Sequence, residues 1–186
     1  SPVDRDELVA ETKANAMELL AREHVAPERV ASIWARMNDI YFLRYAPAEV
    51  AWHTRLLADT EPDDVSLIVA VRTEVERGGN AVLTAGPHRQ QNFARTTALL
   101  DQMGLNIVDA RITPLDGGLG IDTYLVLEDT GLPIADRHRA QQIEQQLRRV
   151  LQNAAPDLPV VTRRAPRQVR MFSTPTQITF TEDPLQ

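Results

Sequence analysis

The sequence lacks cysteine, which excludes a disulfide framework and thiolate metal sites and is compatible with the cytoplasm, where we expect the protein to reside. Aromatic residues make up only 5% of it, too few for the stacking platforms of a base-binding sheet. No run approaches the roughly 18 apolar residues of a membrane-spanning helix, so we expect no membrane contact. Apolar residues nevertheless reach 43%, enough for the core of a folded domain.

The sequence also lacks the residue patterns of an active site. Its histidines are far apart, and none precedes an aspartate: His24, His53, His88 and His138. The glycine-rich run 117–120 lies between two predicted strands, so it indicates a hairpin turn rather than a phosphate-binding loop. No nucleophile elbow is present. We therefore expect no catalytic residue, metal ligand or cofactor in this chain, and we interpret His53 as a packing or hydrogen-bonding residue.

Charge is unevenly distributed along a chain whose net charge is −6. Residues 137–170 carry eight arginines against only Glu144 and Asp157. Such a basic stretch can bind nucleic acid, or it can be an arginine-rich helix face that meets an acidic surface of the same polypeptide. Because the total charge is negative and aromatic platforms are missing, we favour the second interpretation and expect no nucleic-acid partner.

The pattern around which the chain is organised lies in residues 78–129. A short apolar run rich in strand formers stops at Gly86-Pro87, and apolar residues then recur at helical spacing over 93–103. Two alternating stretches follow, joined by Asp116-Gly117-Gly118, whose glycines suit a hairpin turn. Strand, helix, strand, strand is three-quarters of a βαββαβ unit, so the sequence predicts an α+β, ferredoxin-like fold.

Before this unit the sequence predicts a helical segment, residues 1–60. Apolar stripes indicate three helices: about 4–23, about 27–37 and from about 48 onward. The aromatic run 40–45 is expected to be buried between them, and the polar stretch 59–64 is expected to link the two parts of the chain. The start, Ser1-Pro2, has neither Met nor a signal pattern, so we expect a fragment of a longer protein.

The second part, residues 65–182, is expected to be the ferredoxin-like domain. It opens with a strand at 65–75, which the sequence allows either to pair partly or to lie at an edge of the sheet. After residue 129 we expect a helix capped by Asp136, a proline-containing loop at 153–166 and a closing strand near 176–181. Residues 78–182 should then form one four-stranded antiparallel sheet with two helices on one face.

Apolar positions on these predicted elements define an expected core. It consists of Val82, Phe93, Leu100, Val108, Ile112, Ile121, Leu125, Ile143, Leu147 and Val150. Because the two helices cover one face only, the other face needs a cover of its own. We expect Ile107 and Tyr124 to point to that face and to meet the N-terminal helices, a second copy of the chain in a homodimer, or a further domain.

Several short motifs follow one another along the chain in a characteristic order. They are Tyr41-Phe42 with Arg44, Pro47 and Ala51-Trp52-His53, then Arg77-Gly78-Gly79, Asp109-Ala110-Arg111-Ile112, Asp122-Thr123-Tyr124, Val126-Leu127 and Pro166-Arg167-Gln168. Together they resemble the bacterial bifunctional uridylyltransferase/uridylyl-removing enzyme, which modifies the nitrogen regulatory protein PII. The first group resembles the helices that close its metal-dependent (HD) hydrolase region. The others resemble its first ACT domain and the link to the second.

The resemblance implies a non-catalytic regulatory fragment of an enzyme that controls nitrogen metabolism in response to glutamine. In that family nucleotidyl transfer needs a Gly-Ser followed by paired aspartates that hold Mg²⁺, and this chain has no such array. The implied partners are the other domains of the parent enzyme, PII through the full-length enzyme, and glutamine. The alternative is a structural docking or dimerisation module that binds no effector itself.

The resemblance also points to a ligand loop. An ACT domain presents helix N–H groups to an amino-acid carboxylate where its first strand meets its first helix. The family pattern there is Asp, two residues, Gly, Leu, whereas this chain has His88, Gln91 and Asn92 in the corresponding positions. The candidate ligand residues are His88, Arg89, Gln91, Asn92, Phe93, Asp109 and Asp122.

The loop alone offers no acid for the ammonium group of a ligand, because His88 stands in the place of the aspartate. A desolvated charge needs a partner, so we expect this chain by itself to bind glutamine weakly or not at all. Asp109 and Asp122 are either partnered strand residues or the strand-side wall of the ligand site.

Overall fold

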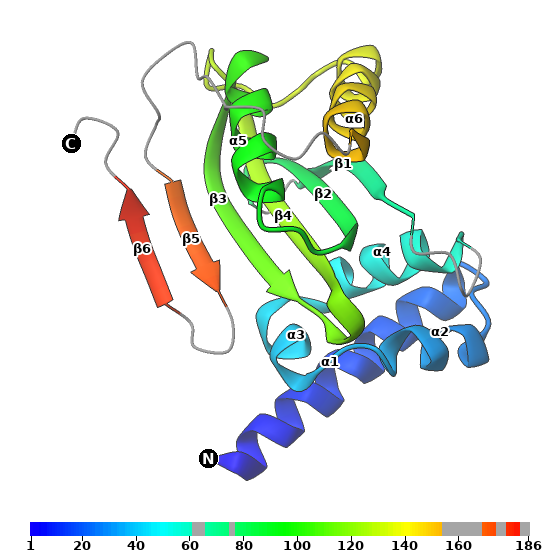
Figure 1. The fold of residues 1–186 in the computed structure, drawn as a ribbon. Helices are drawn as coiled ribbons and strands as arrows, with labels where there is room; N and C mark the ends of the chain where they lie inside the picture. Colours follow the sequence, from blue (N-terminus) through cyan, green and yellow to red (C-terminus); the bar gives the residue numbers. More distant parts are fainter. Residues whose placement is uncertain (61–65, 75–76, 154–168, 174–177, 183–186) are drawn as a thin grey trace. The chain divides into compact units, whose positions relative to one another are not determined.

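The structure is a computed structural model, and it describes residues 1–60, 66–74, 77–153, 169–173 and 178–182 (Figure 1). The chain divides into two compact units: residues 1–65 with 115–118, and residues 66–114 with 119–186. The first unit is helical and the second combines helices with a sheet. The predicted fold class, α+β and ferredoxin-like with an N-terminal helical extension, is confirmed.

The described part of the helical unit contains α1 (Pro2–Arg22), α2 (Pro27–Trp34), α3 (Asp39–Arg44) and α4 (Pro47–Ala58). Proline occupies the first turn of α1, α2 and α4, where a backbone N–H has no intrahelical partner to lose. Ser1 and Asp4 form a capping box that starts α1. The Asn38 side chain accepts a 3.0 Å hydrogen bond from the Tyr41 N–H and so starts α3.

The aromatic run of this unit is buried, as expected, and it contains a polar contact. Tyr41 and Phe42 lie on α3, and the Tyr41 hydroxyl is 2.8 Å from Nδ1 of His53, which is 2% exposed. Burial, followed by the charges of Tyr45 and Glu49, raises the pKa of the Tyr41 hydroxyl well above its usual value, so the hydroxyl keeps its proton. His53 is therefore a buried hydrogen-bonding residue, which confirms the prediction.

The second unit is built on one sheet. Its strands are β1 (Ile68–Glu74), β2 (Gly79–Pro87), β3 (Leu105–Pro114), β4 (Leu119–Glu128), β5 (Val169–Ser173) and β6 (Ile178–Glu182), in the spatial order β1-β2-β4-β3-β5-β6. Between them lie α5 (Asn92–Gln102), the short turn η1 (Asp116–Gly118) and α6 (Arg137–Gln152). Gly117 and Gly118 have φ values of 76° and 74°, which supply the predicted turn between β3 and β4.

The strand beside β2 differs from the one we expected. The prediction that residues 78–182 alone form a four-stranded antiparallel sheet is wrong, because β1, which precedes them, pairs with β2 in antiparallel register from Ile68↔Ala85 to Glu74↔Gly79. The closing strand, β6, instead pairs with β5, which is parallel to β3. A short connection joins β1 to β2, so this hairpin costs little loop-closure entropy. The predicted loop at 153–166 lies, beyond Asn153, outside the described residues.

Helices α5 and α6 cover one face of the strands β1 to β4 (Figure 1). The core between them contains Val69, Val82, Leu99, Leu100, Leu105, Ile107, Ala110, Tyr124, Val126, Ile134, Ile143, Leu147 and Leu151. Four expected core residues are fully buried there: Val82, Leu100, Ile143 and Leu147. Three others are only partly buried against this core: Phe93, Ile112 and Val150.

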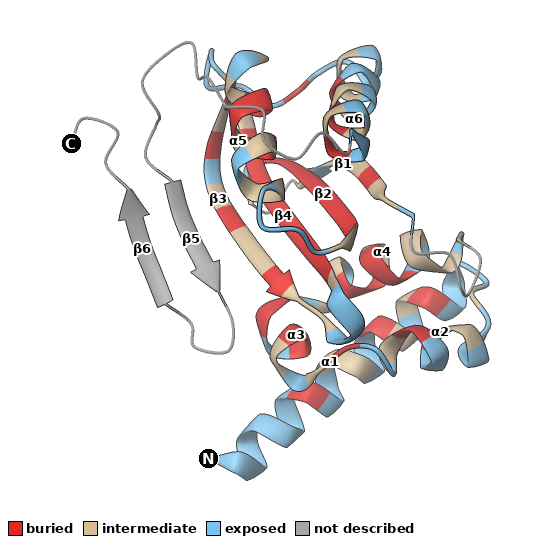
Figure 2. Ribbon diagram, viewed as in Figure 1, coloured by how far each residue is buried: buried red, intermediate tan, exposed pale blue. Residues whose placement is uncertain are grey.

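The opposite face of the sheet is also buried. Successive residues of β2 and β4 are buried, so both faces of these strands are removed from solvent (Figure 2). Ile121 and Leu125, expected in the helix-covered core, alternate with Tyr124 and therefore lie on the opposite face, at 1% and 6% exposure. Which element covers that face in the intact protein stays a prediction.

A β-bulge in β3 overturns two expectations about side-chain direction, those for Ile107 and Val108. The register shifts between Ile107 and Asp109, so one extra residue is inserted opposite β4. Leu105 and Ile107 point into the core before the bulge, and Ala110 does so after it. Val108, expected in the core, is 48% exposed. Ile107, expected on the opposite face, belongs to the helix-covered core. Tyr124 of β4, also expected on the opposite face, lies in the same core because it pairs with Val82 of β2.

The free edge of β1 is covered by two side chains from α6. Glu144 Oε1 accepts a hydrogen bond from the Val71 N–H at 2.9 Å, and Arg148 Nη2 donates to the Val69 carbonyl at 3.4 Å. The two side chains are one helical turn apart on α6, and the two backbone groups are two residues apart on β1. These two spacings match, so both contacts can form at once. Helix α6 is therefore attached to β1 by polar contacts as well as by the core.

The bulge makes neighbouring residues respond differently to truncation. Ile107→Ala should lower the free energy of unfolding by about 2–4 kcal/mol, because it empties a buried site. Val108→Ala should lower it by less than about 1 kcal/mol, because that side chain is exposed. Urea denaturation followed by circular dichroism measures both. A larger loss for Val108→Ala would show that β3 alternates without a bulge.

Candidate ligand site

A small cavity lies where β2 passes into α5. The residue before β1, strands β2 and β4, the β2–α5 connection and the start of α5 all contribute to its lining. The lining residues are Leu67, Thr84, Ala85, Gly86, Pro87, His88, Asn92, Gly120 and Asp122. Its volume is about 10 Å³, measured as the space open to the centre of a water molecule. That is roughly the 10–15 Å³ that one water needs. The cavity coincides with the predicted ligand loop.

Two glycines allow the walls of this cavity to approach each other. A Cβ on Gly120 would lie 2.7 Å from Nδ1 of His88, so the imidazole rests against a position that has no side chain. Gly86 has φ 147°, and a Cβ there would lie 3.3 Å from the Cα of Leu67. Side chains at either glycine would push the β2–α5 connection or the start of β1 away from the cavity.

Asp122 supplies the charge of the site. It is 4% exposed, and its cross-strand neighbours are Thr84 on β2 and Ile112 on β3. Burial raises the pKa of its carboxyl from 3.8 to about 7, while a hydrogen bond with the Thr113 backbone opposes this rise. The Oδ1 atom is buried and has no hydrogen-bond partner among the described residues. An unpartnered carboxylate oxygen is costly to bury, so this atom calls for a donor or a cation.

The first turn of α5 forms the other side of the site. The Asn92 side chain donates to the Pro87 carbonyl at 3.3 Å, which fastens the connection to the helix start. Gln91, the N-cap residue, makes no side-chain capping bond. The first N–H groups of a helix have no intrahelical acceptor, and the helix dipole makes this end positive. A carboxylate oxygen and a positive helix end thus lie at one small cavity.

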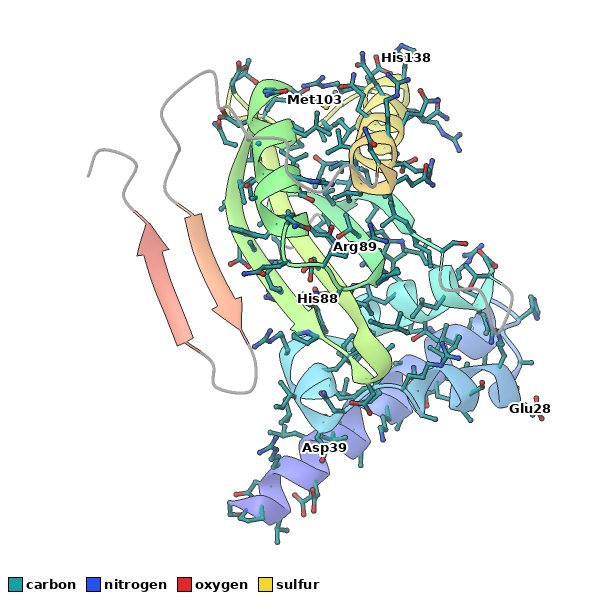
Figure 3. All side chains as sticks on the ribbon, viewed as in Figure 1. Glu28, Asp39, His88, Arg89, Met103 and His138 are labelled. Atoms are coloured by element: carbon teal, nitrogen blue, oxygen red, sulfur yellow. The ribbon has the colours of Figure 1, made fainter. Side chains whose placement is uncertain are left out.

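The structure brings together three of the seven candidate residues: His88, Asn92 and Asp122 line the cavity. Arg89 and Gln91 are exposed on the same connection, where Figure 3 shows His88 and Arg89 side by side along the chain. Phe93 turns toward the core and stacks on Tyr124 with ring centroids 6.3 Å apart. It therefore stabilises the start of α5 rather than lining the cavity.

Asp109 lies away from this site. It is opposite Leu125 and so faces the side of the sheet without α5 and α6, whereas Asp122 faces the helices. Its Oδ2 is 2.5 Å from Nη2 of Arg77 and 3.6 Å from Nε of Arg111. Of the two interpretations of Asp109, the partnered strand residue is the one the geometry supports, because Asp109 and Asp122 lie on opposite faces of the sheet.

Sequence reasoning missed Leu67, Thr84 and Gly120 as cavity residues. Leu67 depends on the pairing of β1 with β2, which the sequence left open. Thr84 and Gly120 belong to strands whose residues are buried on both faces, so alternation carried no signal for their direction. Residues two positions apart on a strand point to the same face of the sheet, so Asp122 must lie on the same face as Tyr124. This spacing is the sequence signal that links the direction of Asp122 to that of Tyr124.

Neither a metal centre nor a membrane span is found in the described parts of the chain. Over these ranges no group of three or more His, Asp or Glu side chains is arranged to hold a metal ion. His24 and His138 are exposed, and Figure 3 places His138 at the start of α6, far along the chain from His88. No helix among the same residues is long and apolar enough to cross a membrane.

The fold and the cavity together define a class of protein: a ferredoxin-like α+β domain, preceded by a helical unit, with a small cavity that contains the Asp122 carboxylate at its first strand–helix connection. No solved structure matches the chain. The family described as uridylyltransferase GlnD fifth domain matches residues 4–56.

The sequence is similar to bifunctional uridylyltransferase/uridylyl-removing enzymes along nearly its whole length. It is 35% identical over 187 residues to that of Pseudomonas putida, covering 98% of this chain and 21% of the relative. It is 36% identical over 184 residues to that of Methylococcus capsulatus, covering 99% of this chain and 21% of the relative. The chain thus spans about a fifth of the length of these curated relatives. The resemblance recognised in the sequence is confirmed, and the chain is related to one part of these enzymes.

The raised pKa of Asp122 predicts a pH-dependent cost. The native carboxyl keeps its proton up to about pH 7, whereas the unfolded one loses it near pH 4. The native state is therefore destabilised as pH rises through this window, and Asp122→Asn removes the effect. From pH 4 to pH 8 the stability of the variant relative to wild type should rise by up to about 4 kcal/mol.

Urea denaturation at several pH values measures this difference. Asp129→Asn is the matched control, because Asp129 is exposed just past the other end of β4. The control should follow the wild-type curve. A pH-independent difference between Asp122→Asn and wild type would mean that the carboxyl titrates normally.

Proposed function

We propose that this chain is a regulatory part of a bifunctional uridylyltransferase/uridylyl-removing enzyme and takes part in its control by glutamine. The observation that carries the proposal is the similarity to these enzymes over 98% of the chain. The cavity at the β2–α5 connection supports it, because a buried carboxylate and a helix N-terminus suit a small zwitterion better than a nucleotide.

The chain itself is non-catalytic in this proposal. The named relatives combine uridylyl transfer and uridylyl removal in a much longer protein, of which the chain matches 21%. Transfer, removal and the Mg²⁺ ions they need would belong to other domains, and PII, the cytoplasmic substrate of the full-length enzyme, would be contacted there. Residues 1–60 would connect the hydrolase region to the sensing domain. Their assignment to the end of that region stays a prediction.

A second candidate function is a docking or dimerisation module without an effector. The apolar side chains of Ile121 and Leu125 on the sheet face opposite α5 and α6 favour it, since an apolar sheet face is a surface on which another element packs. The two candidates differ in one observable property, the binding of glutamine to this chain.

Thermal unfolding in the presence of ligand separates the two functions. A ligand that binds only the native state stabilises it by RT ln(1 + [L]/Kd). With glutamine at ten times a millimolar Kd, the melting temperature should rise by about 3–5 °C. Glutamate, which replaces the side-chain amide with a charge, is the control and should raise it less. Glutamine at about 50 mM is roughly fifty times a millimolar Kd. If the melting temperature is unchanged at that concentration, the docking module is favoured.

A further inference from the structure

The unpartnered oxygen of Asp122 is the feature that the fold does not explain. Its residue is 96% removed from solvent, being 4% exposed, and it contributes no ion pair to the sheet among the described residues. Two half-buried acids of this unit form ion pairs: Asp109 with Arg77, and Glu128 with Arg139 at 3.0 Å. Asp122 lines the cavity at the β2–α5 connection, so a buried carboxylate oxygen without a partner points to a ligand there.

We propose that the Asp122 carboxylate accepts the ammonium group of an α-amino acid whose carboxylate lies at the first turn of α5. The inference rests on the proposed function, because it states how the same site would hold its effector. It replaces the expectation that nothing near the loop can pair with the ammonium. The acid that the β2–α5 connection lacks is supplied from the neighbouring strand β4.

The size of the cavity fits this division of the ligand. Its volume of about 10 Å³ is the space of one water molecule, and an ammonium group is of similar size and only donates hydrogen bonds, as the Asp122 carboxylate requires. The remainder of an amino acid must then lie outside, along the exposed connection that carries His88 and Gln91. The side chain of the ligand would be read there, not in the buried part.

Binding of this kind releases a proton. Near pH 7 the Asp122 carboxyl is protonated in about half of the molecules, because burial raises its pKa to about 7. Only the ionised form pairs with an ammonium, so ligand binding drives the carboxyl proton into solvent while the ammonium keeps its own. Among the cavity residues the other titratable side chain is His88; the facing residues of β1, β2, β4 and α5 are uncharged.

Isothermal titration of the 186-residue chain with L-glutamine tests the inference. The dissociation constant should fall about tenfold from pH 6 to pH 8, because one proton leaves a group that titrates near pH 7. Titration at pH 7 in buffers of different ionisation enthalpy should show release of roughly half a proton per ligand. Asp122→Asn should weaken binding by about thirty-fold or more and remove the pH dependence.

His88→Gln is the matched control, because it changes the other titratable residue of the cavity. It should keep the pH dependence that Asp122→Asn removes. N-acetyl-L-glutamine, which lacks the ammonium, should not bind, and the melting curve of each variant shows that it is folded.

The outcomes separate this inference from the proposed function. Equal glutamine binding by wild type and Asp122→Asn would overturn the inference and leave the sensing function standing. Binding of another α-amino acid, but not glutamine, with dependence on Asp122 would support the inference and remove glutamine from the proposed function. Absence of binding by the twenty common amino acids, each at roughly 50 mM and pH 8, would overturn the inference, since that is about fifty times a millimolar Kd.

Discussion

The antiparallel pairing of β1 with β2 is the constraint on which the α+β unit depends. It fills the sheet edge beside the first strand of the βαββα order with a strand that comes before it in the chain. Helix α6 can then pack over a complete four-stranded surface, because Val69 of β1 belongs to the same core as Ile143 and Leu147. The same pairing carries Leu67 to within van der Waals distance of Gly86 and so forms one wall of the cavity. Without this hairpin both the core and the cavity would be open at one side.

At the cavity, the stability gained by burying β4 is opposed by the cost of dehydrating the Asp122 carboxyl. The sheet gains stability by burying the helix-facing side of β4, yet Asp122 lies on this side and loses its hydration there. Burial raises the pKa of the Asp122 carboxyl, and the carboxyl has one backbone hydrogen bond but no ion pair among the described residues. Asp109, half-buried on the other face, has two arginines close to its carboxylate. The two aspartates of this sheet thus differ in that, among the described residues, Asp109 has cations beside it and Asp122 has none.

The elements could be predicted from the sequence because each has a strong local signal. Gly86-Pro87 ends β2, Asp136 caps α6, and the glycines of η1 form the turn between β3 and β4. What failed was any property that depends on pairing between distant residues. The bulge at Ile107 leaves no mark in a short alternating run, yet it reverses the direction of every side chain before it. The resemblance pointed to the loop between the first strand and helix and made Asp122 a candidate, but alternation did not reveal which face of its strand Asp122 occupies, thirty-four residues after His88.

The contacts of Glu144 and Arg148 with β1 also determine how this sheet can meet other chains. A strand that approached β1 from outside would have to take over the Val71 N–H and the Val69 carbonyl, which these side chains now hold. It would displace a carboxylate and a guanidinium together and leave both to find new partners. Edge strands without such protection invite uncontrolled pairing. A sheet whose edge strand is covered in this way can fold beside other β-structure without pairing with it.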